Sequence, residues 1–342
     1  MKFKDQTILV TGGGGFLGGA IVNQLYQQGA TVRSLSRQRY DSLDRLGVDQ
    51  HQGSLNEPSA VTKAAEGCSM VFHVAAKAGV WGPYDDYHQT NVSGTENIIN
   101  SCRKHGISKL IYTSSPSVVF NGTDMEGVDE SVPYPDHFEA YYPQTKALAE
   151  QKVMAANDDQ LATVSLRPHL IWGPGDNHLV PRILTKGKAG QIRRIGDRDN
   201  QVDSIYIDNA ADAHLLAAQK LAPGSAVAGK TYFISQDEPV SVWDLINRIL
   251  AAGDISPVTK SISPGLAYFA GSLCETVYKT LGIKSEPRMT RFVAKELSTA
   301  HWFDISAAKR DFGYVPKVSI DEGLKRLAAY LKTNELMKHG RH

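Results

Sequence analysis

The chain has almost no net charge, because 37 lysine and arginine residues stand against 36 aspartate and glutamate residues among 342. A balanced charge gives no electrostatic attraction to a phosphate backbone, so we expect no nucleic-acid partner. Cysteine is also scarce: Cys68, Cys102 and Cys274 have neither CxxC nor metal-ligand spacing, and three cannot all pair. This usage favours a reducing, cytoplasmic compartment and predicts no metal site.

Long apolar runs are absent as well. The stretch Gly265 to Cys274 has about half the length that a bilayer requires. The N-terminus leads directly into an apolar segment at residues 7–10, which leaves no room for a signal peptide. We therefore expect at most a peripheral membrane contact.

One amphipathic segment stands out in the C-terminal half. Apolar residues recur there at helical spacing, namely Leu266, Phe269, Leu273, Val277 and Leu281. Such a face could cover the core, form a lid over an apolar substrate, or contact a partner or a membrane.

The first 175 residues alternate short β-branched runs with longer helical patterns, which predicts an α/β fold with a Rossmann-type, doubly wound parallel sheet. Strands are expected at 7–11, 31–35, 70–75, 109–114 and 163–167, and helices near Gly15, Glu57, Asn91 and Tyr142. Residues 204–207 and 230–235 are expected to return to the same sheet. We therefore expect a cofactor-binding domain at 1–175, with 201–235 returning to its sheet, and a smaller C-terminal substrate-binding lobe at 176–200 and 236–342.

A glycine-rich turn follows the first expected strand. Gly12, Gly15 and Gly18 have GxxGxxG spacing, with Phe16 and Leu17 at the start of the next helix. Glycine permits a tight turn and a close approach of backbone to a pyrophosphate, and a helix N-terminus attracts negative charge. The pattern predicts a dinucleotide site.

The end of the second expected strand indicates which dinucleotide binds. NAD sites usually carry an acidic residue there for the ribose 2′-hydroxyl, but this chain has no carboxylate until Asp41. A guanidinium can instead form a bidentate contact with a 2′-phosphate. Arg37, assisted by Ser36, is our candidate, and NADP(H) is the favoured cofactor, although these arginines could also be solvated loop residues.

Tyr142 and Lys146 are four residues apart, which places them on one face of a helix. A free tyrosine titrates near 10, and a neighbouring ammonium is expected to lower that pKa towards neutrality, where the phenol can transfer protons. A hydroxyl from the strand end at residues 111–117 could stabilise negative charge on a substrate oxygen. Together these residues predict a reductase site.

At this point the chain resembles the extended short-chain dehydrogenase/reductase family. Further matches are Val74-Ala75-Ala76, Asn91 to Thr95, Leu166-Arg167-Pro168 and Tyr206 to Asn209. The resemblance implies that Ser115 is the catalytic serine, with Ser114 and Ser117 close by, that Lys146 also holds the nicotinamide ribose, and that Ala75, Ala76 and Pro168 contact the cofactor. Many relatives have an aspartate at the adenine where this chain has Ser54.

Residues 167–176, 301–303 and 312–316 are similar to the 3β-hydroxysteroid dehydrogenase branch, and residues 75–82, 84–89, 112–118 and 171–176 to the reductases of bacterial olefin biosynthesis. The second resemblance implies reduction by NADPH of a long-chain 2-alkyl-3-ketoalkanoic acid to the 3-hydroxyacid, alongside other enzymes of that pathway. A homodimer is also possible. The alternatives are a sterol or 3β-hydroxysteroid dehydrogenase, a sugar-nucleotide epimerase or dehydratase, and a non-catalytic NADP-binding sensor.

An apolar ketoacid needs a trough for its chains and a cation for its carboxylate. The Trp81 loop and the face at 266–281 could line the trough, and Lys77, His169 and Arg182 are the candidates for the carboxylate, each of which could equally be structural. His73 and His88 lack metal-ligand spacing, and we interpret both as structural.

Overall fold

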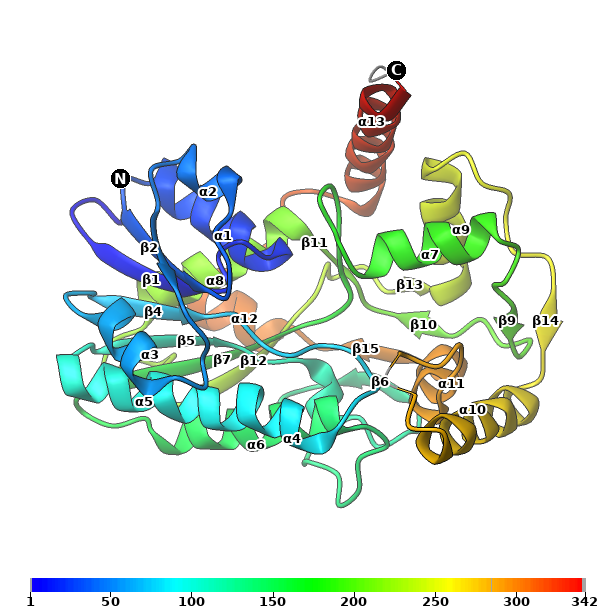
Figure 1. The fold of residues 1–342 in the computed structure, drawn as a ribbon, viewed down its shortest axis with the longest axis horizontal. Helices are drawn as coiled ribbons and strands as arrows, with labels where there is room; N and C mark the ends of the chain where they lie inside the picture. Colours follow the sequence, from blue (N-terminus) through cyan, green and yellow to red (C-terminus); the bar gives the residue numbers. More distant parts are fainter. Residues whose placement is uncertain (1, 284, 340–342) are drawn as a thin grey trace.

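The computed structural model describes residues 2–283 and 285–339, with the backbone alone for 334–339. A seven-stranded sheet, parallel throughout, forms its centre (Figure 1). The strand order is β12-β7-β5-β4-β1-β2-β3. Strands β2 and β3 are added on one side of β1, and β4 and the later strands on the other, so the order switches between β1 and β4. In such a sheet the cofactor binds at the carboxyl ends of the strands beside this switch point. The strands are β1 (Thr7–Thr11), β2 (Thr31–Ser36), β3 (Asp49–Gln52), β4 (Met70–His73), β5 (Lys109–Thr113), β7 (Ala162–Pro168) and β12 (Lys230–Ile234).

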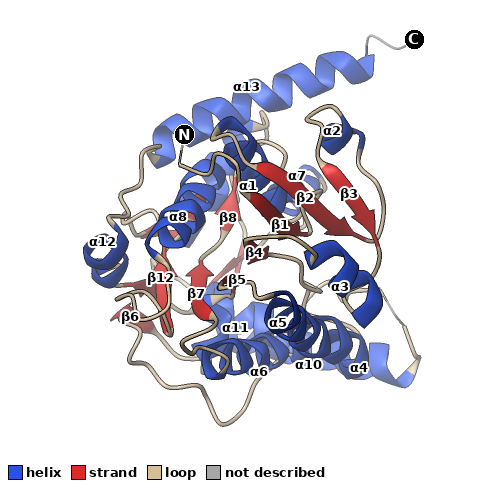
Figure 2. Cartoon of the chain, turned by 90° about the vertical axis from the view of Figure 1, so that its left-hand side faces the viewer, coloured by secondary structure: helices blue, strands red, loops and turns tan. Residues whose placement is uncertain are grey.

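Helices cover both faces of this sheet, as Figure 2 shows. Side chains alternate along each strand, so in β1 Leu9 packs under one layer while Ile8 and Val10 pack under the other. The first layer contains α3 (Pro58–Ala65), α5 (Gly94–His105) and α6 (Tyr141–Ala155), and the second contains α1 (Phe16–Gln27) and α8 (Ile207–Lys220). Short helices complete the domain: α2 (Asp41–Asp44), α4 (Tyr84–Tyr87), a π-helical turn at His88–Ser93, a 3₁₀ turn at Pro116–Val119 and α12 (Ser306–Phe312).

A smaller lobe is assembled from segments far apart in the sequence. Its sheet has the order β13-β10-β15-β6, from β13 (Val240–Ser241), β10 (Gln201–Val202), β15 (His301–Phe303) and β6 (Met125–Val128). Two-stranded pairs join β8 (Ile171–Trp172) to β11 (Ile205–Tyr206) and β9 (Arg194–Ile195) to β14 (Ser261–Ile262). The helices here are α7 (Leu179–Lys188), α9 (Val242–Ala252), α10 (Pro264–Thr280) and α11 (Arg291–Ser298), and α13 (Ile320–His339) ends the chain.

The five strands expected in the first 175 residues are confirmed within two residues at each end. One expectation is wrong: residues 204–207 do not return to the large sheet, because Ile205 and Tyr206 pair with β8. Only two residues are extended there before α8 begins at Ile207. Residues 230–234 do join the large sheet, beside β7.

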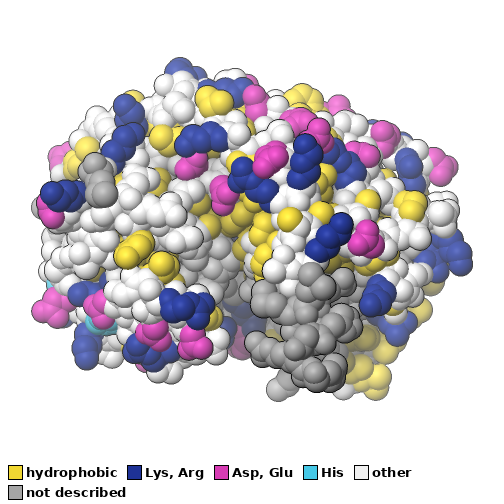
Figure 3. Space-filling model, turned by 90° about the horizontal axis from the view of Figure 1, so that it is seen from above, with side chains coloured by type: hydrophobic (Ala, Val, Ile, Leu, Met, Phe, Trp, Pro, Cys, Tyr) yellow, Lys and Arg dark blue, Asp and Glu magenta, His cyan; other side chains and the backbone are white. Residues whose placement is uncertain are grey.

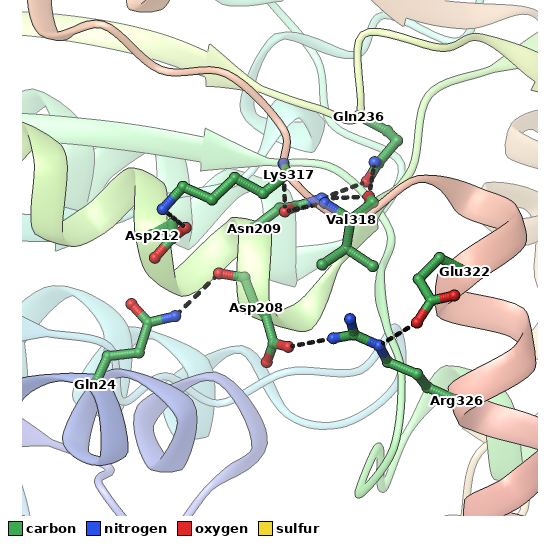
Figure 4. A network of polar contacts seen from close by, with 9 residues as sticks. All are labelled: Gln24, Asp208, Asn209, Asp212, Gln236, Lys317, Val318, Glu322 and Arg326. Atoms are coloured by element: carbon green, nitrogen blue, oxygen red, sulfur yellow. Dashed lines mark hydrogen bonds and ion pairs between the residues drawn. The ribbon is translucent and has the colours of Figure 1, made fainter. Parts of the chain in front are cut away.

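A buried asparagine of α8, Asn209, links this helix to the segment that leads into α13. The Asn209 amide donates to the Val318 carbonyl at 2.8 Å and to the Gln236 side chain at 3.0 Å, and its oxygen accepts from the Lys317 and Val318 amides (Figure 4). Arg326 of α13 also pairs, at 3.4 Å, with Asp208, the residue before Asn209 in α8. Beside this network, α1 and α8 border a cavity of about 690 Å³. The network is structural, since it satisfies backbone groups at the entry to α13.

The apolar face of α10 points away from the protein. Its five residues are 41–67% exposed, namely Leu266, Phe269, Leu273, Val277 and Leu281, and the helix instead buries Ala267, Gly271 and Glu275. A β-carbon on Gly271 would lie 2.7 Å from the Thr290 backbone, so α10 and α11 are in close contact there. The expectation that this face covers the core is therefore wrong, and the lid and contact-surface alternatives stay predictions.

Elsewhere, basic and acidic side chains are interspersed, as one face shows in Figure 3. Among the described residues, no helix is both long and apolar enough to cross a bilayer.

Candidate active site

The glycine-rich turn joins β1 to α1 in a conformation that only glycine allows. Gly12 has φ +71°, and a β-carbon on Gly18 would lie 2.1 Å from the Gly12 carbonyl oxygen. Gly15 is the N-cap of α1, which has no side-chain cap and no acidic residue in its first turn. The amides at the start of α1, at Phe16 and Leu17, are thus left for an external anion, which is the requirement of a dinucleotide pyrophosphate.

The loop after β4 lies directly against this turn. The Thr11 hydroxyl accepts hydrogen bonds from the Val74 and Ala75 amides at 3.1 Å, and a β-carbon on Gly12 would be 3.1 Å from Ala75. Ala75 therefore lies against the glycine turn, and Ala76 follows it in the same loop. Pro168 ends β7 and is buried beside Ile234.

Three arginines lie in or just after β2, and two of them already form ion pairs within the protein. Arg33 bonds Asp49 at 2.7 Å, and Arg39 bonds Asp44 at 2.6 Å. Arg37 is exposed and its side chain has no hydrogen-bond partner among the described residues, while its carbonyl accepts from Gln52 at 3.1 Å. The Ser36 hydroxyl lies 3.4 Å from that of Ser34.

Tyr142 and Lys146 lie one turn apart at the N-terminal end of α6. The Lys146 ammonium is buried, donates to the Thr113 carbonyl at 2.6 Å and lies 4.1 Å from the centre of the Tyr112 ring. Thr113 is the last residue of β5, so this bond fixes the helix to the strand that carries the serines. The sequence spacing and the sheet topology together bring the expected residues to one edge of the sheet.

Ser115 is the most accessible of the three candidate serines. Ser114 and Ser117 are buried, whereas Ser115 is partly exposed. Its hydroxyl accepts from the Ser117 amide at 3.2 Å and lies 2.9 Å from the Ser117 hydroxyl, so its orientation is fixed. The Ser115 hydroxyl also acts to lower the pKa of the Tyr142 phenol, so the two groups are near each other.

The electrostatics differ from the sequence-based expectation. Burial raises the pKa of Tyr142, and the Ser115 hydroxyl offsets only part of this effect. Burial also lowers the pKa of Lys146 to about 7, which the nearby Glu150 carboxylate partly opposes. The expected lowering of the tyrosine pKa by Lys146 is therefore not found, because burial outweighs the one group that lowers this pKa, which is Ser115 and not Lys146.

A buried ion pair continues the same helix face one turn further on. Glu150 accepts from Arg167 at 2.6 Å, from Ser165 at 2.7 Å and from Tyr134 at 2.8 Å. The Arg167 guanidinium and the Ser165 hydroxyl hold the pKa of the Glu150 carboxyl below its usual value despite burial. Glu150 therefore supplies a fixed negative charge beneath Lys146.

The sequence reasoning missed a residue that aligns two parts of the site. Asn91, on the π-helical turn, accepts from the Lys77 amide at 2.7 Å and donates to the Lys77 carbonyl at 3.1 Å and the Thr145 hydroxyl at 3.0 Å. It thereby ties the loop after β4 to α6. A signal was present, since Asn91 belongs to a matched motif, but nothing in the sequence identified its partners. His73 is structural as expected, bonded to Thr11 and Thr95.

The C-terminal lobe reaches the same end of α6 from the other side. Lys295 of α11 pairs with Glu139 at 2.5 Å, two residues before α6 begins, and the Glu296 carboxylate raises the pKa of Tyr142. Trp81 donates to the Ile283 carbonyl at 3.1 Å and meets Tyr278 edge to face at 6.0 Å. The Trp81 loop and the end of α10 are thus in contact, which sequence alone could not establish.

The three candidates for a carboxylate contact have different surroundings. Lys77 pairs with Asp86 at 3.1 Å and lies above the Tyr87 ring. His169 is buried, its Nε2 lies 2.7 Å from Nδ1 of His301, and burial holds its pKa well below the usual value. A neutral, bonded imidazole cannot act as the expected cation. Arg182 is half-exposed and pairs with Glu286.

Comparison with known sequences agrees with this site. The chain is 53% identical to the 2-alkyl-3-oxoalkanoate reductase of Stenotrophomonas maltophilia (94% of this chain, 98% of that protein), and 51% identical to that of Shewanella oneidensis (96% and 87%). It is 37% identical to the decarboxylating sterol-4-alpha-carboxylate 3-dehydrogenase of Saccharomyces cerevisiae (96% and 98%).

Comparison with solved structures agrees with the fold. The crystal structure of gox2253 is 25% identical and superposes with a TM-score of 0.77 (98% of this chain, 99% of that one). The UDP-glucose 4-epimerase of Thermotoga maritima is 21% identical, with a TM-score of 0.75 (96% and 99%). The sequence pattern of the 3-beta hydroxysteroid dehydrogenase/isomerase family matches residues 9–262. The chain therefore belongs to this family, within the extended short-chain dehydrogenases/reductases.

Proposed function

We propose that the protein is an NADP(H)-dependent reductase that converts the 3-keto group of a long-chain 2-alkyl-3-oxoalkanoate to the 3-hydroxy group. The observation that carries this proposal is the position of the Tyr142 phenol, one turn before buried Lys146 and beside the fixed hydroxyl of Ser115. The identity of 53% and 51% to two 2-alkyl-3-oxoalkanoate reductases, over nearly the whole chain, supports the substrate class.

The substrates after which these relatives are named share one chemical feature. A 2-alkyl-3-oxoalkanoate and a sterol-4-alpha-carboxylate both carry a carboxylate on the carbon next to the reacting carbon at position 3. A site for this chemistry needs a proton donor at the oxygen and an anion site close to it.

The mechanism follows from the charges and donors of the site. The Ser115 hydroxyl polarises the ketone oxygen, and the Tyr142 phenol donates the proton to that oxygen as negative charge develops. The raised pKa keeps Tyr142 protonated at neutral pH, which suits reduction. Lys146, held by the Thr113 carbonyl, supplies positive charge near the phenol in its protonated form, which Glu150 favours, and is proposed to bind the nicotinamide ribose. The nicotinamide, when bound, supplies the hydride.

NADP(H) is the proposed cofactor, since the end of β2 offers Arg37 and no carboxylate where a 2′-phosphate would lie. Ser36 is proposed to assist. The uncapped start of α1 supports binding of the pyrophosphate.

We further propose that residues 176–200 and 236–342 form the substrate-binding lobe, because α11 meets the start of α6 and the end of α10 meets Trp81. The exposed face of α10 is our candidate surface for a second copy, another enzyme of olefin synthesis, or the edge of a membrane.

The test measures the reverse reaction, because free 3-ketoacids lose carbon dioxide spontaneously. Purified protein is incubated with a synthetic long-chain 2-alkyl-3-hydroxyacid and NADP⁺ or NAD⁺, and reduced nicotinamide is followed by absorbance. We expect turnover of the hydroxyacid with NADP⁺ that disappears in Tyr142→Phe, which should still bind NADPH. Tight NADPH binding without turnover of any alcohol would instead favour the sensor alternative.

A sterol dehydrogenase is the second candidate, favoured by 37% identity to the sterol-4-alpha-carboxylate enzyme. A 3β-hydroxysteroid is therefore run in parallel. Turnover of the steroid alone would replace the proposed substrate by this one.

A further inference from the structure

Two cations outside the catalytic group lie on successive turns of α7. Arg182 pairs with Glu286, which belongs to the connection between α10 and α11. Lys186 donates to the Arg288 carbonyl in the same connection at 3.3 Å. Both cations thus face one short segment of the C-terminal lobe.

This segment contacts the loop after β4, which carries Trp81. On one side, Trp81 bonds the Ile283 carbonyl, and the Tyr87 hydroxyl in turn donates to the Trp81 carbonyl at 3.0 Å. Burial raises the pKa of Tyr87 to about 12, and the Glu286 carboxylate and Tyr142 add to this shift, so both lie near the Tyr87 hydroxyl. The charged group on α7 therefore lies within electrostatic reach of the residues around Tyr142.

A second carboxyl connects Arg182 with the phenol. The Glu296 carboxylate of α11 raises the pKa of Tyr142, and Arg182 in turn acts to lower the pKa of Glu296. Burial raises the pKa of Glu296 to about 7, and Arg182 opposes this shift only in part. The cluster thus contains the cations Arg182 and Lys186 and the carboxyls of Glu286 and Glu296.

The other candidates for an anion site are less suitable. Lys77 carries a point charge instead of a planar guanidinium, and His169 is neutral and bonded to His301. The guanidinium of Arg182 is 39% exposed and can form two parallel hydrogen bonds to a carboxylate. Its present partner, Glu286, is a carboxylate of the protein itself.

We propose that Arg182 is the cation that binds the substrate carboxylate, and that Glu286 occupies this position in the free protein until the acid displaces it. The inference rests on the proposed function, because it assumes an acid whose carboxylate lies next to the reacting carbon. Glu286 then acts as an internal competitor that sets the affinity for the acid without touching the chemistry. An ester of the same acid has no carboxylate, so it would not compete with Glu286 for Arg182.

The test compares a 2-alkyl-3-hydroxyacid with its methyl ester, with NADP⁺ as the oxidant. Arg182→Gln should raise KM for the acid by about 10- to 100-fold, the usual effect of losing hydrogen bonds to a charged group, and leave KM for the ester unchanged. Glu286→Gln should lower KM for the acid by about two- to fivefold, the contribution of a half-exposed ion pair. Lys188→Gln, an exposed cation at the end of α7, is the matched control and should change neither.

The outcomes separate this inference from the proposed function. Failure of the wild-type protein to oxidise both acid and ester would overturn the proposed function, and the inference with it. Oxidation of both, with KM changed equally for acid and ester in Arg182→Gln, would overturn the inference alone. If Arg182→Gln does not fold, Glu286→Gln decides, since an unchanged or raised KM for the acid contradicts an internal competitor.

Discussion

Replacement of Arg37 tests the assignment of NADP(H) most sharply. The side chain is exposed and has no hydrogen-bond partner among the described residues, so Arg37→Gln should not disturb the fold. Hydrogen bonds between charged groups contribute about 1.5–3 kcal/mol, which corresponds to a factor of about 10–150 in affinity. Solvent exposure favours the lower half of this range. We therefore expect NADPH binding to weaken by about 10- to 50-fold, with NADH binding unchanged.

The assay is titration of each reduced nucleotide, followed by nicotinamide fluorescence. The matched control is Arg39→Gln, two residues away, whose guanidinium already pairs with Asp44 at 2.6 Å and should matter little for either nucleotide. Equal weakening of NADPH and NADH by Arg37→Gln would refute the reasoning, because a 2′-phosphate contact affects only NADPH. Weakening by Arg39→Gln alone would assign the phosphate to the other arginine.

Three further predictions concern other parts of the site. Gly18→Ala should abolish NADPH binding in the same titration while the protein stays folded by circular dichroism, because the added β-carbon would lie 2.1 Å from the Gly12 carbonyl oxygen; retained binding would contradict the assigned turn. The raised pKa of Tyr142 predicts that kcat/KM for alcohol oxidation increases up to and beyond pH 9, where phenolate forms; an oxidation rate that levels off below pH 8 would oppose this. Glu296 has a pKa raised from 4.5 to about 7, so the folded protein binds a proton that the unfolded chain releases, and the resulting loss of stability develops as pH increases through this window. Glu296→Gln should therefore raise Tm at pH 8 and change it little at pH 4.5, and the opposite order would be inconsistent with a buried carboxyl.

The central sheet could be predicted because its strands are short β-branched runs between helical patterns. β3 was missed, since Asp49–Gln52 contains no apolar residue and is a strand only because it extends the edge beside β2. The second sheet was missed for a different reason. Its strands have two to four residues each and come from distant parts of the chain, so no local pattern marks them.

The face of α10 illustrates a limit of periodicity. The spacing of Leu266 to Leu281 correctly predicts a helix, but periodicity cannot say which side packs inward. Close packing of Gly271 against the Thr290 backbone selects the side with small residues, and the large apolar residues remain exposed.

The glycine turn and the spacing of Tyr142 and Lys146 are local features, so their positions could be predicted from the sequence. The pKa of Tyr142 could not, because it depends on desolvation in the folded protein and on Glu296, 154 residues further along the chain. The pairing of Arg182 with Glu286 depends in the same way on how α7 meets the connection after α10.

Deuterium transfer tests the central claim most directly. A long-chain 2-alkyl-3-hydroxyacid labelled with deuterium at C3 is incubated with NADP⁺ and the protein, and the reduced nucleotide is analysed by mass spectrometry. We predict one deuterium in the NADPH formed by the wild-type protein and no NADPH with Tyr142→Phe. NADPH without deuterium, or equal formation with Tyr142→Phe, would contradict a reductase that acts at C3 through this phenol.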